Sequence, residues 1–327
     1  MNGINQKKTA LRVPLGGKKG NKRQEIEVST CFAPLLRWVI GWWPPDEKRI
    51  AIGLDATTLA DRFTILAVSV LYRGCAIPIA WVILPGNQKG SWKPHWQRRQ
   101  RLLSDLDQVI PDDWTVIVCT DRGLYAKWLY QAIVKLGWHP FMRINLGGTY
   151  RPDGQARFRA LRKCVPNKGD HWAGKVTCFK TNPLKCTLLA CWEEGYKDPW
   201  LIVTDLAPEQ ANVCWYGLRT WIECGFKDNK RGGWQWQNSK ITDPARAERI
   251  WLAIAVATLW VLSVGGEADA NLPVSGFDEL PETHIARRHR KESTLSCSLT
   301  ELFSTRTNSY FGRFITRRGH TFRLLPA

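Results

Sequence analysis

Two short apolar runs, each followed by an aspartate, constrain the fold more than any other feature of this sequence. Residues 50–54 read I-A-I-G-L and lead into Asp55, and residues 114–120 read W-T-V-I-V-C-T and lead into Asp121. Runs of this length and composition are typical of fully buried strands. Such strands occur in sheets that helices cover on both faces. We therefore expect two central strands of an α/β domain, each presenting an aspartate at its carboxyl end.

The segments around these two runs complete the pattern of a mixed sheet. Residues 63–72 and 76–84 are rich in Val, Ile and Leu and are separated by a short turn, which predicts an antiparallel hairpin. Leucines at helical spacing predict a helix within residues 94–110. A further helix is expected over residues 124–136 and a short strand over residues 139–144. This order of elements indicates a sheet covered by helices.

Two more helices are expected outside this block. Residues 31–43 are apolar and predict a short helix that ends before Pro44, because proline disfavours the helical conformation in the residue before it. Asp243 is a good N-cap with Pro244 in the first turn, and it opens an apolar helix that runs to residue 264. The most apolar part, residues 250–264, is shorter than the roughly twenty residues of a membrane-spanning helix. We expect a buried core helix.

The formal net charge of +18 over 327 residues indicates an acidic partner. Nucleic acid is the commonest such partner of a basic protein, and a membrane surface is the weaker alternative. Ten cysteines are scattered through the chain with no Cys-X-X-Cys pair and no histidine at zinc-finger spacing. We interpret them as free thiols in a reducing compartment. No apolar stretch follows the basic N-terminus, so no secretory signal peptide is expected.

A polar stripe is predicted between residues 216 and 230. The sequence intervals place four side chains within roughly 60° of arc on one face of a helix: Tyr216, Arg219, Glu223 and Lys230. The residues between them are mostly apolar, so the other side of the helix would pack into a core. A carboxylate, a guanidinium, a phenol and an ammonium that point the same way suit a phosphate and a metal ion. An amphipathic helix with a solvated charged face is the alternative.

The spacing Y-(2)-R-(3)-E-(6)-K resembles the signature of cut-and-paste transposases from bacterial insertion sequences. The resemblance covers residues 37–264 and implies an RNase H-like core, a mixed α/β sheet flanked by helices. It implies catalytic carboxylates that bind two Mg²⁺ ions, with Mn²⁺ as a substitute, at three positions: Asp55, Asp121 and Glu223. It implies DNA-phosphate contacts at three others: Tyr216, Arg219 and Lys230.

From this resemblance we expect a DNA transposase that catalyses metal-dependent cleavage and strand transfer at transposon ends. The implied partner is double-stranded DNA, both the transposon ends and the target, and no membrane partner is implied. A homodimer is expected to bind this DNA. The implied location is the bacterial cytoplasm, at the nucleoid. A related nuclease that cuts without joining is one alternative. A truncated, inactive descendant that only binds DNA is the other, and it is favoured by the short segment, residues 1–49, ahead of the first aspartate strand.

The chain is expected to divide into five segments. Residues 1–48 form a basic arm and a short helix, residues 49–144 the first part of the core, and residues 200–265 its second part. Residues 145–199 are basic and rich in glycine, which predicts a β-rich insertion between the second aspartate and the glutamate. The resemblance implies that this insertion grips the transposon end, and a plain surface excursion is the alternative. Residues 266–327 form a basic C-terminal tail.

Overall fold

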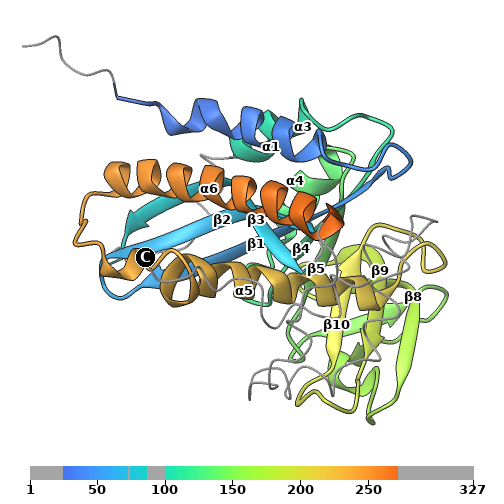
Figure 1. The fold of residues 1–327 in the computed structure, drawn as a ribbon. Coiled ribbons are helices and arrows are strands. Elements are labelled where there is room, and N and C mark those ends of the chain that lie inside the picture. The colour runs from blue at the N-terminus through green and yellow to red at the C-terminus, as the bar shows by residue number, and fades with distance from the viewer. Residues whose placement is uncertain (1–24, 73, 87–99, 272–327) are drawn as a thin grey trace, which may run out of the picture.

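Ten strands form one mixed sheet flanked by helices in the computed structural model, which describes residues 25–72, 74–86 and 100–271 (Figure 1). Most of the expected basic arm, nearly all of the C-terminal tail and the start of the expected helix within residues 94–110 lie outside these ranges. The strand order is β3-β2-β1-β4-β5-β10-β9-β8-β6-β7. This architecture confirms the predicted α/β fold.

The centre of the sheet consists of three parallel strands: β1 (Arg49–Leu59), β4 (Thr115–Thr120) and β5 (His139–Arg143). Two antiparallel strands continue it beyond β1: β2 (Phe63–Tyr72) and β3 (Cys75–Pro85). Most side chains of these strands are buried. The predicted hairpin and strands are confirmed, with small shifts of their ends.

One strand differs from its prediction, because β1 continues past Asp55 to Leu59. Its parallel pairing with β4 stops at Leu54, opposite Thr120, as the sequence suggests. Its antiparallel pairing with β2 continues to Leu59, which pairs with Phe63. Asp55 is therefore the first residue past the parallel pairing with β4. It still lies within β1, because the pairing with β2 extends this strand.

Short helices precede or connect these strands. The expected helix over residues 31–43 consists of the 3₁₀ turn η1 (Val28–Cys31) and helix α1 (Phe32–Ile40). Helices α3 (Gln100–Asp107) and α4 (Lys127–Lys135) lie within the ranges predicted for them.

Helix α6 (Pro244–Asn271) packs against β3. Its predicted cap is present, because Asp243 Oδ1 accepts a hydrogen bond from the Arg246 N–H at 2.8 Å. One ridge is buried at every fourth position: Ala247, Trp251, Ala255 and Leu259. The expectation of a buried helix is only half right, because another stripe is exposed: Val256, Trp260 and Val264. Over Pro244–Val264 the helix is long and apolar enough to span a membrane by length and composition alone, with 28% of its most apolar window buried.

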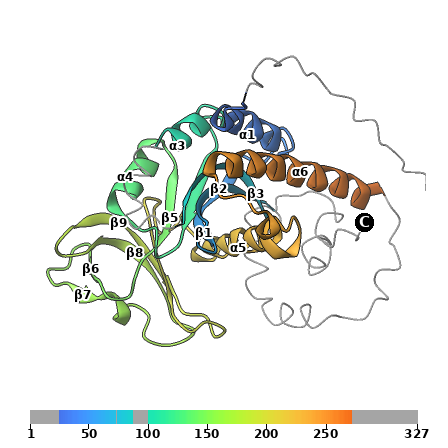
Figure 2. The same ribbon diagram turned by 90° about the vertical axis from the view of Figure 1, so that its left-hand side faces the viewer.

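The segment between β5 and β10 (Trp200–Thr204) forms four strands that extend the sheet to one side (Figure 2). They are β6 (Thr149–Pro152), β7 (Arg159–Ala160), β8 (His171–Cys178) and β9 (Leu184–Cys191). The segment is thus β-rich, as predicted. Because β9 pairs with β10 and β10 with β5, the hydrogen-bonded sheet runs without interruption from core to insertion. The domain boundaries stay a prediction.

Candidate active site

The carboxyl ends of the three parallel strands are aligned in register. Leu54 pairs with Thr120, and Thr120 pairs with Met142. The residues that follow these three come to the same edge of the sheet: Asp55, Asp121 and Arg143. Ligands of open α/β sheets bind at this kind of edge. The structure therefore brings the two predicted aspartates together and adds Arg143, which sequence reasoning missed although it ends the next strand along the chain.

The predicted stripe does not lie on one continuous α-helix. The 3₁₀ segment η3 (Val213–Arg219) carries Tyr216 and Arg219, helix α5 (Thr220–Lys227) carries Glu223, and the π-helical segment η4 (Asp228–Gly232) carries Lys230. Glycine and short polar residues at 217, 225, 228 and 229 have low helix propensity, which fits these changes of helix type. The stripe nevertheless keeps three of its four side chains on one cleft.

Two glycines let α5 lie close against the core strands. A Cβ at Gly53 would stand 3.3 Å from Ile222 of α5, and a Cβ at Gly225 would stand 3.1 Å from the Cβ of Ala76 on β3. Side chains alternate along a strand, so Asp55 points to the same side of β1 as position 53, the side that α5 covers. This close approach places the Glu223 helix over the first aspartate.

Arg219 connects two of the predicted catalytic acids. Its Nη2 donates to Asp55 Oδ2 at 2.7 Å, and its Nη1 donates to Glu223 Oε1 at 2.6 Å. The exposed fractions of these side chains are 15% for Arg219, 8% for Asp55 and 53% for Glu223. The other oxygen of Asp55 accepts the N–H of Ala56 at 2.8 Å. Both oxygens of Asp55 are thus hydrogen-bonded within the chain.

The buried position of Asp55 is costly for its charge. Burial raises the pKa of Asp55 above its usual value, and the negative charge of Asp121 raises it further. The guanidinium of Arg219 and the N–H of Ala56 lower the pKa of Asp55 but do not cancel the rise. Burial disfavours the charge of Arg219 as well, but the carboxylates of Asp55 and Glu223 outweigh it and raise its pKa. The site therefore holds a fully charged arginine beside a carboxylate that needs positive charge nearby.

The acids line a cleft of about 420 Å³. Its lining residues are Asp55, Ala56, Thr57, Asp121, Arg219, Glu223, Phe226, Lys227 and Lys230. Lys230 Nζ donates to the hydroxyl of Thr57 at 2.6 Å, which fixes the ammonium at the cleft wall. Lys227 was not predicted, although its position four residues after Glu223 puts it on the same helix face. Thr57 was not predicted either, although it lies two residues after Asp55 on the same side of the strand.

Tyr216 is the stripe residue that does not line the cleft. Its side chain is 4% exposed and its ring contacts Trp200 edge to face at 5.3 Å. Its hydroxyl is buried and has no hydrogen-bond partner among the described residues. Burial raises the pKa of Tyr216 further above its ordinary value, so the phenol stays protonated and can donate. An unsatisfied buried hydroxyl is costly and marks a place where a ligand oxygen would be favourable.

The donor set of the cleft fits a hard divalent cation. Three carboxylates and the Thr57 hydroxyl offer only oxygen, the donor type that Mg²⁺ and Mn²⁺ prefer. Asp55 and Asp121 project from strands, whereas Glu223 is half exposed on a helix and has room to adjust. A cation here would also relieve the cost of the buried Asp55 charge.

A family model for the transposase DDE domain matches residues 96–260. The matched residues make up about half of the chain and contain Asp121 and the whole segment from Tyr216 to Lys230. The chain belongs to the DDE transposase family. None of the curated proteins compared with the transposase matches it. Asp55 precedes the matched residues, and the pairing of β1 with β4 brings it beside Asp121, which lies within them.

Proposed function

We propose that the transposase cleaves DNA at transposon ends and joins the freed strand to target DNA, with Asp55, Asp121 and Glu223 holding two Mg²⁺ ions. The observation that carries this proposal is the convergence of the three carboxylates on one cleft whose rim also bears Lys227 and Lys230. Carboxylates alone would bind a cation, and ammonium groups alone would bind DNA. A cleft that combines them suits a phosphodiester substrate.

The bound metal ions would activate the oxygen nucleophile and stabilise charge on the leaving oxygen. Asp55 and Asp121 come from paired strands, and they fix the position of the site. Glu223 comes from α5, which packs against β1 and β3, and it would complete the set. Mn²⁺ should substitute, because it accepts the same oxygen donors.

Arg219 has two proposed tasks. It neutralises Asp55 and Glu223 in the structure, which stabilises the site before substrate binds. With Asp55 and Glu223 holding metal ions instead, the same two nitrogens would be free to bind a phosphate in two-pronged fashion. We therefore assign two tasks to the guanidinium of Arg219: it balances the charge of the site, and it contacts the scissile phosphate.

The other two predicted phosphate contacts, Lys230 and Tyr216, differ in their burial and in their hydrogen bonds. Lys230, held by Thr57, would meet the backbone as a point charge at the cleft wall. Tyr216 lies outside the lining of the cleft, and it would donate its unsatisfied hydroxyl hydrogen to a terminal phosphate oxygen once substrate binding opens access to that hydroxyl. Lys227, exposed on the same side, adds a further positive charge.

The proposed partner is double-stranded DNA, bound by a homodimer in the nucleoid of a bacterial cytoplasm. A cut-and-paste reaction acts on two transposon ends, and each chain supplies one set of the three acids. Two copies would therefore provide one active site for each end.

A strand-transfer assay tests the proposed function. Labelled transposon ends are incubated with target DNA, the protein and Mg²⁺, and the products are separated on a gel. We expect joined products from the wild type and from Glu209→Gln, which changes an exposed acid outside the cleft, and none from Glu223→Gln. Cleavage without joining would instead indicate a nuclease, and DNA binding without either reaction would indicate an inactive descendant.

A further inference from the structure

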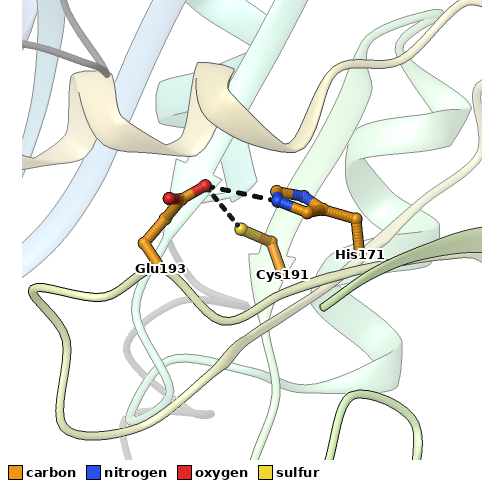
Figure 3. Close-up of side chains that lie close together, drawn as sticks. All are labelled: His171, Cys191 and Glu193. Atoms are coloured by element: carbon orange, nitrogen blue, oxygen red, sulfur yellow. Dashed lines mark hydrogen bonds and ion pairs between the residues drawn. The ribbon is translucent and has the colours of Figure 1, made fainter. Parts of the chain in front are cut away.

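A second group of candidate metal ligands lies in the insertion, apart from the cleft acids (Figure 3). His171 is the first residue of β8, Cys191 is the last residue of β9, and Glu193 follows in the loop that leads to β10. One ligand atom of each lies within 4.8 Å of those of the other two. A thiol, an imidazole and a carboxylate that converge in this way form a donor set different from that of the cleft.

The sheet register brings these residues together. His171 pairs directly with Cys191 in the antiparallel ladder of β8 and β9, and Cys191 also pairs with Trp200 of β10. Cys191 thus belongs to a strand that is paired on both sides. Glu193 starts a tight turn, since the N–H of Tyr196 donates to its carbonyl at 3.1 Å. The pairing of β8 with β9 and the turn at Glu193 both restrict the positions of the three side chains.

The spacing of the ligand atoms approaches that of a tetrahedral site. The Cys191 thiol donates to Glu193 Oε1 at 3.2 Å, and His171 Nε2 lies 3.6 Å from the same oxygen. Zinc–ligand bonds of about 2.0–2.3 Å at tetrahedral angles put neighbouring ligand atoms about 3.3–3.5 Å apart. Two of the three separations are therefore already close to the required value. The third, between the Cys191 sulfur and a His171 ring nitrogen, is at most 4.8 Å, and rotation of the exposed His171 side chain would adjust it.

We propose that His171, Cys191 and Glu193 bind a zinc ion, with water in the fourth position. Thiolate and imidazole ligands favour zinc over magnesium, whereas the oxygen-only cleft has the opposite preference. His171 and Glu193 have exposed fractions of 54% and 32%, so an ion can enter from solvent. Cys191 is 2% exposed and anchors the site in the sheet.

Zinc at this place would hold the β9–β10 loop against the start of β8. These strands connect the insertion to the core sheet, so the ion would stiffen that connection rather than take part in cleavage. Binding replaces the thiol hydrogen of Cys191 with a sulfur–zinc bond, and the proton leaves to solvent. Without a metal, the same three residues would form only a hydrogen-bonded group around Glu193.

Cobalt substitution distinguishes these two possibilities. The full chain is stripped with a chelator and titrated with Co²⁺, and the near-ultraviolet absorption of a thiolate bound to cobalt is recorded. We expect a band that saturates at one equivalent and that Zn²⁺ removes. Cobalt on the cleft carboxylates gives no thiolate band, so the signal reports a cysteine ligand, and variants identify which cysteine it is. Cys191→Ser should abolish the band, and His171→Ala should weaken cobalt binding at least about tenfold.

Matched controls test the assignment. Cys31→Ser removes a thiol in η1, and His139→Ala removes a histidine that pairs with Asp205, and both should keep the wild-type band and affinity. Because the His171 side chain is half exposed, His171→Ala should fold even if the buried Cys191→Ser does not. The absence of a band in the wild type, its persistence in folded Cys191→Ser, or unchanged affinity in His171→Ala would overturn the proposal.

Discussion

Replacement of Arg219 by lysine should be more damaging than its conservative character suggests. The arginine uses two nitrogens at once, one on Asp55 at 2.7 Å and one on Glu223 at 2.6 Å. Lysine keeps the charge but has a single nitrogen and lacks the planar fork. The variant can therefore keep only one of the two contacts at full strength.

The magnitude follows from the burial of the two contacts. A hydrogen bond between charged groups contributes about 1.5–3 kcal/mol, and the contact with Asp55 is almost fully buried. The contact with Glu223 is half exposed and is worth at most about 1 kcal/mol. Arg219→Lys should thus lower the free energy of unfolding by about 1–3 kcal/mol. Arg219→Ala, which leaves the Asp55 carboxylate buried and unpaired, should cost about 3–5 kcal/mol.

The effect on catalysis should be larger than the effect on DNA binding. If the two-pronged phosphate contact is tightest in the transition state, its loss slows cleavage about ten- to a hundredfold. The assays are urea unfolding without divalent ions and single-turnover cleavage of a pre-bound transposon end in Mg²⁺, with DNA affinity followed in parallel. Arg249→Lys is the control, because Arg249 pairs with Glu25 at the surface at 3.3 Å. Cleavage rates within about twofold of wild type would refute the phosphate role and leave Arg219 with charge balance alone.

Three further predictions concern the buried acid, the insertion and the helix contact. Because burial raises the pKa of Asp55 in the folded state, its ionisation destabilises the fold as pH rises from the unfolded value through the folded one. In urea unfolding without divalent ions, Asp55→Asn should therefore lose this pH dependence; a free energy of unfolding that falls with pH as in the wild type would contradict this. Residues 143–185 hold ten Lys or Arg against two Asp, so Arg157→Gln and Arg162→Gln should each lower the slope of log affinity against log salt by about 0.9 if they contact phosphates. An unchanged slope would assign these charges to solvent. Gly225→Ala should destabilise the fold by about 1–3 kcal/mol, because the new Cβ crowds Ala76. Gly195→Ala is the control and should not destabilise the fold, because a Cβ there meets open space. A gain in stability of about 1 kcal/mol in Gly225→Ala would mean that helix propensity outweighs the contact with Ala76.

The sequence predicted the central strands and both aspartates because their signal is local. An apolar run followed by an acid reports a buried strand and its end, and parallel alignment of Leu54 with Thr120 then brings Asp55 and Asp121 together. The antiparallel extension of β1 past Asp55 was missed, because it depends on the partner strand. Arg143 shows the same limit: only the alignment of Thr120 with Met142 identifies it as a third strand-end residue.

Contacts between distant segments account for the rest. The spacing of Arg219 and Glu223 predicted their proximity, but the pairing of Arg219 with Asp55 joins residues that are 164 positions apart. The helix pattern predicted a single stripe, whereas low-propensity residues divide the segment into three helix types. His171 and Cys191 meet only through the register of β8 and β9, and cysteine spacing gives no sign of it.

The most direct measurement of the central claim is single-turnover cleavage of a labelled transposon end in Mg²⁺ by three variants: Asp55→Ala, Asp121→Ala and Glu223→Ala. Each change removes a proposed metal ligand, so each variant should fail to cleave while binding DNA nearly as well as the wild type does. Glu209→Ala, at an exposed acid outside the cleft, should cleave normally. Full cleavage by any one of the three variants would remove that residue from the site, and for Asp55 it would contradict the claim that the pairing of β1 with β4 brings a catalytic acid beside Asp121.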